Sequence, residues 1–114
     1  MTDNQAPYIP LSVPDYAAMR DDEKPHLLLD VREPHEFTEM HIPGAVLIPM
    51  NDVLMRMTEL QGHDSIVVVC RSGSRSAMVA MALRDNGMTS ALYNLEGGTM
   101  AWVRAGHEYA QGEE

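Results

Sequence analysis

The chain has 114 residues, enough for one domain with a single buried core and too few for two. Its 8 basic and 17 acidic residues give a formal net charge of -9, which argues against nucleic acid as a partner because nucleic acid favours a basic face. The single cysteine permits no internal disulfide, and the apolar runs are too short to cross a membrane.

Short apolar runs alternate with helical patterns along the chain, which is typical of βαβ units around a parallel sheet. We expect residues 1–8 to be loose, residues 9–109 to form the domain and residues 110–114 to fray. In the first half of the chain the sequence predicts a helix over 12–20, a strand over 27–31, a helical turn opened by Glu33 and Pro34, and a strand over 45–48. A helix capped by Asn51 and running to about Leu60 follows, and then a strand over 66–69 and a helix from Ser74 to about 86. The last predicted elements are a strand over 91–95, a turn at Gly97 and Gly98, and a helix over 99–105.

The most informative segment is residues 65–76, because it carries the single cysteine from a β-branched run into a loop that opens a helix. Cys70 is therefore expected at the carboxyl end of a parallel strand and close to a helix N-terminus. Ligands bind at such strand ends, and the unpaired amides of a helix N-terminus attract negative charge. A thiolate and an anionic substrate both fit this position.

The spacing between Cys70 and Arg75 separates two reaction classes. Cysteine-dependent phosphatases wrap a tetrahedral oxyanion with a loop in which five residues separate the cysteine from the arginine. Here four residues separate them. We expect the tighter ring of amides to suit one extra sulfur atom better than a phosphoryl group.

The loop Cys70-Arg71-Ser72-Gly73-Ser74-Arg75-Ser76 resembles the active-site loop of the rhodanese family of sulfurtransferases. Three further segments resemble signatures of the same family, and they follow in the family's order: residues 28–37, residues 41–45 and residues 95–102. The resemblance covers roughly residues 9–107. Met40 stands where many members have glycine and Ser74 where many have asparagine, and neither changes the loop length. The resemblance implies an α/β rhodanese-like fold with a central, mainly parallel five-stranded sheet and helices on both faces.

Cys70 is the expected nucleophile, since an inert core cysteine would not be accompanied by two arginines, Arg71 and Arg75, that lack an anion. The expected substrate-binding residues are the rest of the loop, namely Arg71, Ser72, Gly73, Ser74, Arg75 and Ser76. Arg75 lies in the first helical turn, where a cation opposes the dipole, and this favours contact with a bound anion. The alternative for either arginine is a solvated charge or a salt bridge to an acid such as Asp30 or Glu96.

Asp30 and Arg32 end a strand on the Cys70 side of the sheet, and the resemblance implies that this pair is structural. His41 is expected to order its own turn. We expect neither a metal nor a cofactor, because no pair of His, Cys or Asp has ligand spacing. The 10 methionines are interpreted mainly as core filling, with Met50, Met55 or Met100 as an alternative rim for a protein partner.

These observations predict a sulfurtransferase that takes sulfur from thiosulfate or a persulfide onto Cys70 and passes it to a thiophilic acceptor. The acceptor would be cyanide in vitro and a thiol or a protein in the cell. A non-catalytic rhodanese-like interaction module stays open, as does, with less support, a phosphatase or arsenate reductase. Residues 1–25 lack the apolar stretch of a secretory signal, so the expected location is the cytoplasm. The oligomeric state cannot be read from the sequence.

Overall fold

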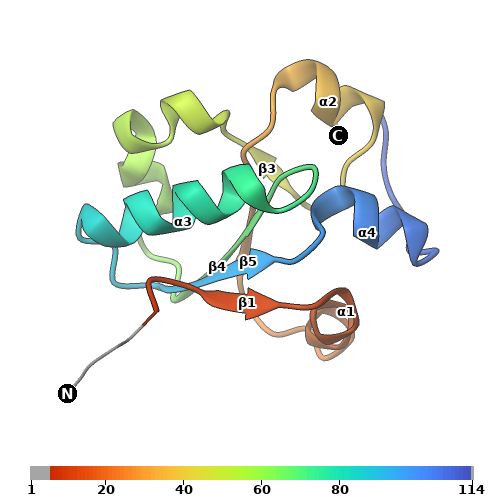
Figure 1. The fold of residues 1–114 in the computed structure, drawn as a ribbon, viewed down its shortest axis with the longest axis horizontal. Helices are drawn as coiled ribbons and strands as arrows, with labels where there is room; N and C mark the ends of the chain where they lie inside the picture. Colours follow the sequence, from red (N-terminus) through yellow and green to blue (C-terminus); the bar gives the residue numbers. More distant parts are fainter. Residues whose placement is uncertain (1–5, 114) are drawn as a thin grey trace.

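Five parallel strands form the centre of the computed structural model, which describes residues 6–113 (Figure 1). In their order across the sheet they are β1 (Ile9–Leu11), β5 (Ala91–Leu95), β4 (Ser65–Val69), β2 (Leu27–Asp30) and β3 (Val46–Leu47). The helices are α1 (Val13–Asp21), α2 (Pro34–Glu39), α3 (Ser74–Asp85) and α4 (Gly98–Arg104), together with the 3-10 helices η1 (Met50–Asp52) and η2 (Leu54–Leu60). This arrangement confirms the predicted α/β class.

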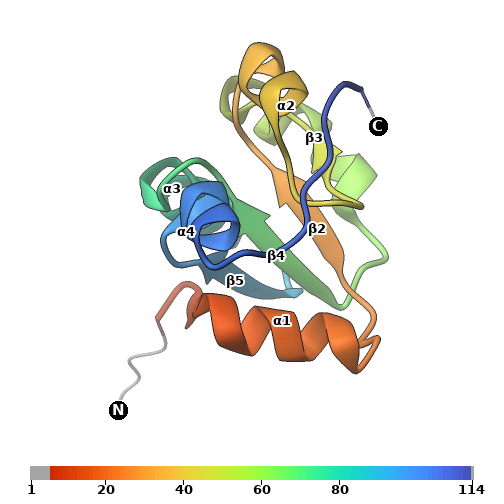
Figure 2. The same ribbon diagram turned by 90° about the vertical axis from the view of Figure 1, so that its right-hand side faces the viewer.

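The central strand β4 contributes to two cores, because its side chains alternate between the faces of the sheet. Ile66, Val68 and Cys70 belong to the core that α3, η1 and η2 cover. Val67 and Val69 belong to the other core, with residues of α1 and α4. Figure 2 shows α1 lying along one face of the sheet and α3 on the opposite side. Since both faces are buried, the strand reads as a continuous apolar run rather than an alternating one.

Two predicted helix starts agree with the structure. Ser12 is the N-cap of α1, and its hydroxyl accepts a hydrogen bond of 3.2 Å from the Asp15 amide. Glu33 is the N-cap of α2 and forms a capping box with Glu36, whose carboxylate accepts from the Glu33 amide at 2.9 Å. None of the helices within residues 6–113 is long and apolar enough to cross a membrane.

The helix predicted from Asn51 to Leu60 is wrong in its form. The segment contains η1 and η2, and Arg56 inside η2 has non-helical backbone angles (φ -113°, ψ 21°). Asn51 lies within η1 rather than at a cap position. The chain turns twice here so that Val53 and Leu60 both reach the core next to α3.

The strand β1 was not predicted, because three residues that include Pro10 give little pattern. Proline cannot donate a ladder hydrogen bond and is tolerated at a sheet edge, where β1 lies, paired only with β5. The expected loose segment therefore ends before Ile9. Its residues 1–5 lie outside the described residues, while Pro7 accepts a hydrogen bond from Arg84 through its carbonyl.

Within the segment expected to fray, residues 110–112 make hydrogen bonds to α2 and to His41. Ala110 and His41 exchange two backbone hydrogen bonds of 2.8 and 2.9 Å. The Gly112 amide donates to the Thr38 carbonyl at 2.9 Å, and the Gln111 side chain donates to the Glu39 carbonyl at 3.1 Å. Backbone pairing, which composition does not reveal, fixes this polar segment.

Candidate active site

The loop between β4 and α3 contains Cys70 and lies at the carboxyl end of the sheet (Figure 1). Gly73 is the N-cap residue of α3 and has φ +108°, a backbone conformation that costs glycine little and other residues much. This conformation turns the chain from the strand into the helix within four residues. The predicted strand, loop and helix are therefore all present.

The sulfur of Cys70 is fully buried and faces hydrogen-bond donors. The Gly73 amide donates to Sγ at 3.1 Å, and the Ser76 hydroxyl lies 3.3 Å from it. Burial acts to raise the pKa of the Cys70 thiol. The Ser76 hydroxyl and the loop amides outweigh burial and hold the pKa below its ordinary value. The site therefore favours a nucleophilic thiolate.

The N-terminus of α4 fixes the other side of the loop. The Thr99 amide donates to the Cys70 carbonyl at 2.9 Å, and the Met100 amide donates to the Arg71 carbonyl at 3.1 Å. A Cβ at Gly98 would lie 2.3 Å from the Cys70 carbonyl oxygen, so only glycine permits this approach. The sequence predicted a turn at Gly97 and Gly98 but not its contact with the loop that contains Cys70.

Asn94 of β5 completes the surroundings of the sulfur and was missed by the sequence reasoning. Its Nδ2 donates to the Gly73 carbonyl at 3.1 Å, and its Oδ1 lies 2.5 Å from the Ser76 hydroxyl. Asn94 is buried, as is Ser76. A polar amide within a buried strand was the signal in the sequence that could have identified it.

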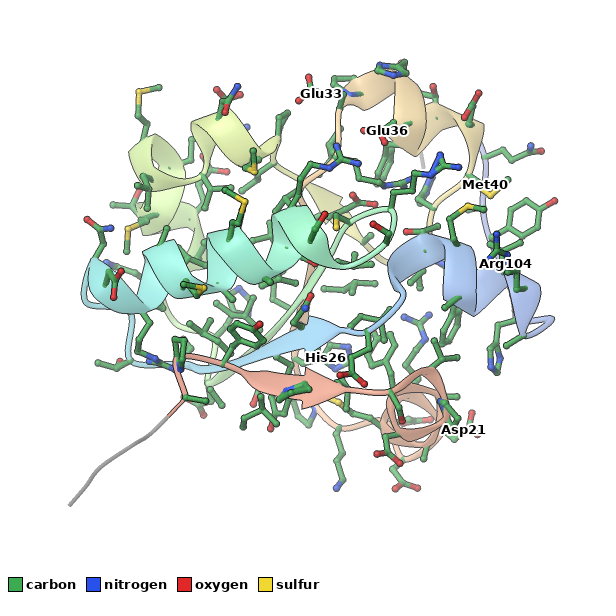
Figure 3. All side chains as sticks on the ribbon, viewed as in Figure 1. Asp21, His26, Glu33, Glu36, Met40 and Arg104 are labelled. Carbon is green, nitrogen blue, oxygen red and sulfur yellow. The ribbon has the colours of Figure 1, made fainter. Side chains whose placement is uncertain are left out.

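Arg75 is paired with Glu36 of α2. Its Nη1 and Nη2 each donate to a carboxylate oxygen of Glu36 at 2.8 Å. Figure 3 shows Glu36 projecting from α2 toward the start of α3. The hydrogen bonds from Arg75 lower the pKa of Glu36 to about 2, and the carboxylate in turn raises the pKa of Arg75. The salt bridge considered for Arg75 thus exists, with Glu36 rather than Asp30 or Glu96 as the acid.

Asp30, the last residue of β2, forms a buried ion pair with Arg32, in which Arg32 Nη2 and Asp30 Oδ2 are 2.8 Å apart. Arg32 also donates to the Met40 carbonyl at 2.8 Å and to the Glu36 carbonyl at 3.4 Å. The pair thereby ties the middle and the C-terminal end of α2 to the sheet. These contacts of Arg32 set the position of the helix that presents Glu36.

The other residues singled out in the sequence occupy different surroundings. Arg71, Ser72 and Ser74 are exposed at the rim of the loop, where the Ser72 amide helps to lower the pKa of Cys70. His41 is buried, stacks on Phe37 and makes a 2.8 Å hydrogen bond to its carbonyl, so it orders its own turn. Among the residues that the structure describes, no cluster of His, Cys, Asp and Glu could hold a metal.

Comparison with known proteins decides the family, because the model of the rhodanese-like domain matches residues 12–105. The chain belongs to the rhodanese-like family. A sulfurtransferase of Allochromatium vinosum is 40% identical over 80 residues, which cover 70% of this chain and 74% of that protein. An adenylyltransferase and sulfurtransferase of Zea mays is 35% identical over 97 residues, which cover 79% of this chain and 20% of that protein.

Solved structures agree with this rhodanese-like assignment. A thiosulfate sulfurtransferase from Pseudomonas aeruginosa superposes with a TM-score of 0.85 at 26% sequence identity, over 93% of this chain and 21% of that one. The chain thus spans about a fifth of the length of the Zea mays and Pseudomonas proteins. Its family and its relatives support sulfur transfer as the general chemistry and a sulfurtransferase as the kind of enzyme.

Proposed function

We propose that this rhodanese-like protein takes sulfane sulfur from thiosulfate or a persulfide donor onto Cys70 and passes it to a thiophilic acceptor. One observation carries the proposal: the only cysteine of the chain receives the Gly73 amide at 3.1 Å and lies beside the Ser76 hydroxyl. These donors favour the thiolate that must attack the donor. The relatives named as sulfurtransferases support the same chemistry.

In the first half-reaction the Cys70 thiolate attacks the outer sulfur of thiosulfate. A new bond forms between Sγ and this sulfur, the sulfur–sulfur bond of thiosulfate breaks, and sulfite leaves with the bonding electron pair. Cys70 then carries a persulfide whose negative charge lies on the outer sulfur. The loop amides of Ser72, Gly73 and Ser76, which act on Cys70, and the positive end of the α3 dipole would stabilise that charge.

In the second half-reaction an acceptor nucleophile attacks the outer sulfur. The persulfide bond breaks, its electron pair returns to Sγ as the Cys70 thiolate, and the sulfur leaves on the acceptor. Cyanide would give thiocyanate, and a thiol or a protein thiolate would give a new persulfide. Because the donor leaves before the acceptor reacts, the kinetics should be ping-pong. A cytoplasmic, reducing location would keep Cys70 available, which is why we place the protein there.

The test is the intact mass of the protein. Incubation with thiosulfate, or with an organic persulfide, should add one sulfur atom, and cyanide should then restore the original mass with release of thiocyanate. Cys70→Ser should stay unmodified throughout. A sulfur gained by that variant would refute Cys70 as the nucleophile. A wild-type protein left unmodified by both donors would refute the enzyme and favour the non-catalytic interaction module.

A further inference from the structure

The hydroxyl of Ser76 lies between two acceptor atoms. Its oxygen is 3.3 Å from Cys70 Sγ and 2.5 Å from Asn94 Oδ1. The amide of Asn94 has a defined orientation, because its Nδ2 donates to the Gly73 carbonyl at 3.1 Å. The atom that faces Ser76 is therefore the oxygen, which has no hydrogen to give. Ser76 and Asn94 are both buried, so protein atoms supply their partners.

A hydroxyl has one hydrogen and can serve only one of these acceptors at a time. When Cys70 is a thiol, its S–H donates to the Ser76 oxygen and the Ser76 O–H donates to Asn94 Oδ1, so each acceptor has a donor. When the proton leaves the sulfur, the thiolate attracts the Ser76 hydrogen. Asn94 Oδ1 then faces the Ser76 oxygen with no hydrogen between them. A buried acceptor without a donor is unfavourable, so this arrangement opposes ionisation.

We propose that Asn94 is a positioning residue that acts through Ser76: it draws the hydroxyl hydrogen away from Cys70 and so favours the forms of the site in which Sγ carries no charge. The thiol is one such form. The other, which rests on the proposed function, is the persulfide, because its charge lies on the outer sulfur. Asn94 thus shifts the equilibrium from the Cys70 thiolate, which carries no transferred sulfur, toward the Cys70 persulfide.

The charged groups around Cys70 come from several elements. Arg75 of α3 interacts with Cys70 and is paired with Glu36 of α2, and the Asp30–Arg32 pair follows β2. Arg71 in the loop and Glu96 after β5 are exposed. All of these groups remain in the variants described next, so differences between the variants report on residue 94 itself.

The experiment measures the rate of Cys70 alkylation by iodoacetamide against pH, which is specific because the chain has one cysteine. Asn94→Ala removes the competing acceptor and should lower the pKa of Cys70 by about one unit, which makes alkylation roughly tenfold faster at pH values below the pKa. Asn94→Asp keeps an acceptor oxygen and adds negative charge, so it should raise the pKa of Cys70.

The expected pKa shifts of Cys70 have opposite signs in Asn94→Ala and Asn94→Asp, and this distinguishes a positioning role of Asn94 from general damage to the loop. Both variants lose the Nδ2 bond to the Gly73 carbonyl, so a merely loosened loop would move the pKa of Cys70 in the same direction in both. Shifts of the same sign, or an unchanged pKa in Asn94→Ala, would overturn the proposal. Asn94→Leu, which keeps the volume, replaces the alanine variant if that one does not fold.

A second arm tests the route through Ser76. In a Ser76→Ala background the hydroxyl is gone, and Asn94→Ala should no longer change the pKa of Cys70. A shift as large as in the wild-type background would contradict the proposed route. Alkylation needs no sulfur donor, so this result stands independently of whether the protein transfers sulfur.

Discussion

The guanidinium of Arg75 and the carboxylate of Glu36, 39 residues apart in the chain, form a two-point ion pair with both distances at 2.8 Å. Arg75 lies in the first turn of the helix that follows Cys70, and Glu36 belongs to a helix tied to the sheet by Arg32. An anionic sulfur donor that reaches Arg75 must therefore share it with Glu36 or displace Glu36.

Replacing Arg75 by Ala tests whether this cation binds the anionic donor. We expect kcat/KM for thiosulfate to fall by the equivalent of about 1.5–3 kcal/mol, the range for hydrogen bonds to charged groups. The control is an uncharged sulfur donor, for which the loss should be much smaller. An equal loss with both donors would show that Arg75 acts through structure alone. Arg71→Ala, measured in the same way, tells which arginine dominates.

Glu36 should contribute to stability in a defined pH range. Hydrogen bonds from Arg75 lower its pKa from 4.5 to about 2 in the folded protein. A carboxylate with a lowered pKa stabilises the fold fully above its unfolded pKa, near 4.5, and loses this contribution as the pH falls toward 2. The urea midpoint of Glu36→Gln should therefore lie below that of wild type at neutral pH and approach it at low pH.

Glu39→Gln is the matched control, because it removes an exposed carboxylate of the same helix. It should leave the urea midpoint nearly unchanged at neutral pH. A Glu36→Gln difference that stays constant from neutral to acid pH would contradict the role given to the ion pair.

Gly98→Ala should disturb the loop that holds Cys70. The new Cβ would lie 2.3 Å from the Cys70 carbonyl oxygen and 2.5 Å from that of Arg71, in addition to the strain of φ +60°. Gly106→Ala, with φ +88° and open space around the Cβ, isolates the strain alone. We expect about 1–2 kcal/mol of destabilisation for Gly106→Ala and about 1–3 kcal/mol more for Gly98→Ala, measured by urea unfolding. Equal losses would mean that the contact is unimportant.

The length of the loop between Cys70 and Arg75 predicts that the protein does not hydrolyse phosphate esters. With four residues between Cys70 and Arg75, the Gly73 amide lies only 3.1 Å from the sulfur, and we expect no room for a phosphoryl group at attack distance. Hydrolysis of an aryl phosphate should not exceed that of Cys70→Ser, while sulfur transfer from thiosulfate is readily measured. Faster phosphate hydrolysis than sulfur transfer would make the phosphatase the better interpretation.

The sequence predicted those parts of the site that depend on local pattern. The valine run before Cys70, the start of a helix at Ser74 and the succession of β2 to β5 with the main helices all follow from neighbouring residues. Glu36 and Asn94 were missed because their roles depend on contacts between elements far apart in the chain. Within its own helix Glu36 accepts a hydrogen bond from the Glu33 amide, and only the fold brings its carboxylate to Arg75.

The pairing of residues 110–112 with α2 has a practical consequence for protein engineering. A truncation that removes Ala110 would release the bridge to His41 and the contacts along the helix that presents Glu36. A protein fused at the C-terminal end would be linked to the same segment. An expression tag at the C-terminal end would therefore lie next to residues that hydrogen-bond to the helix presenting Glu36.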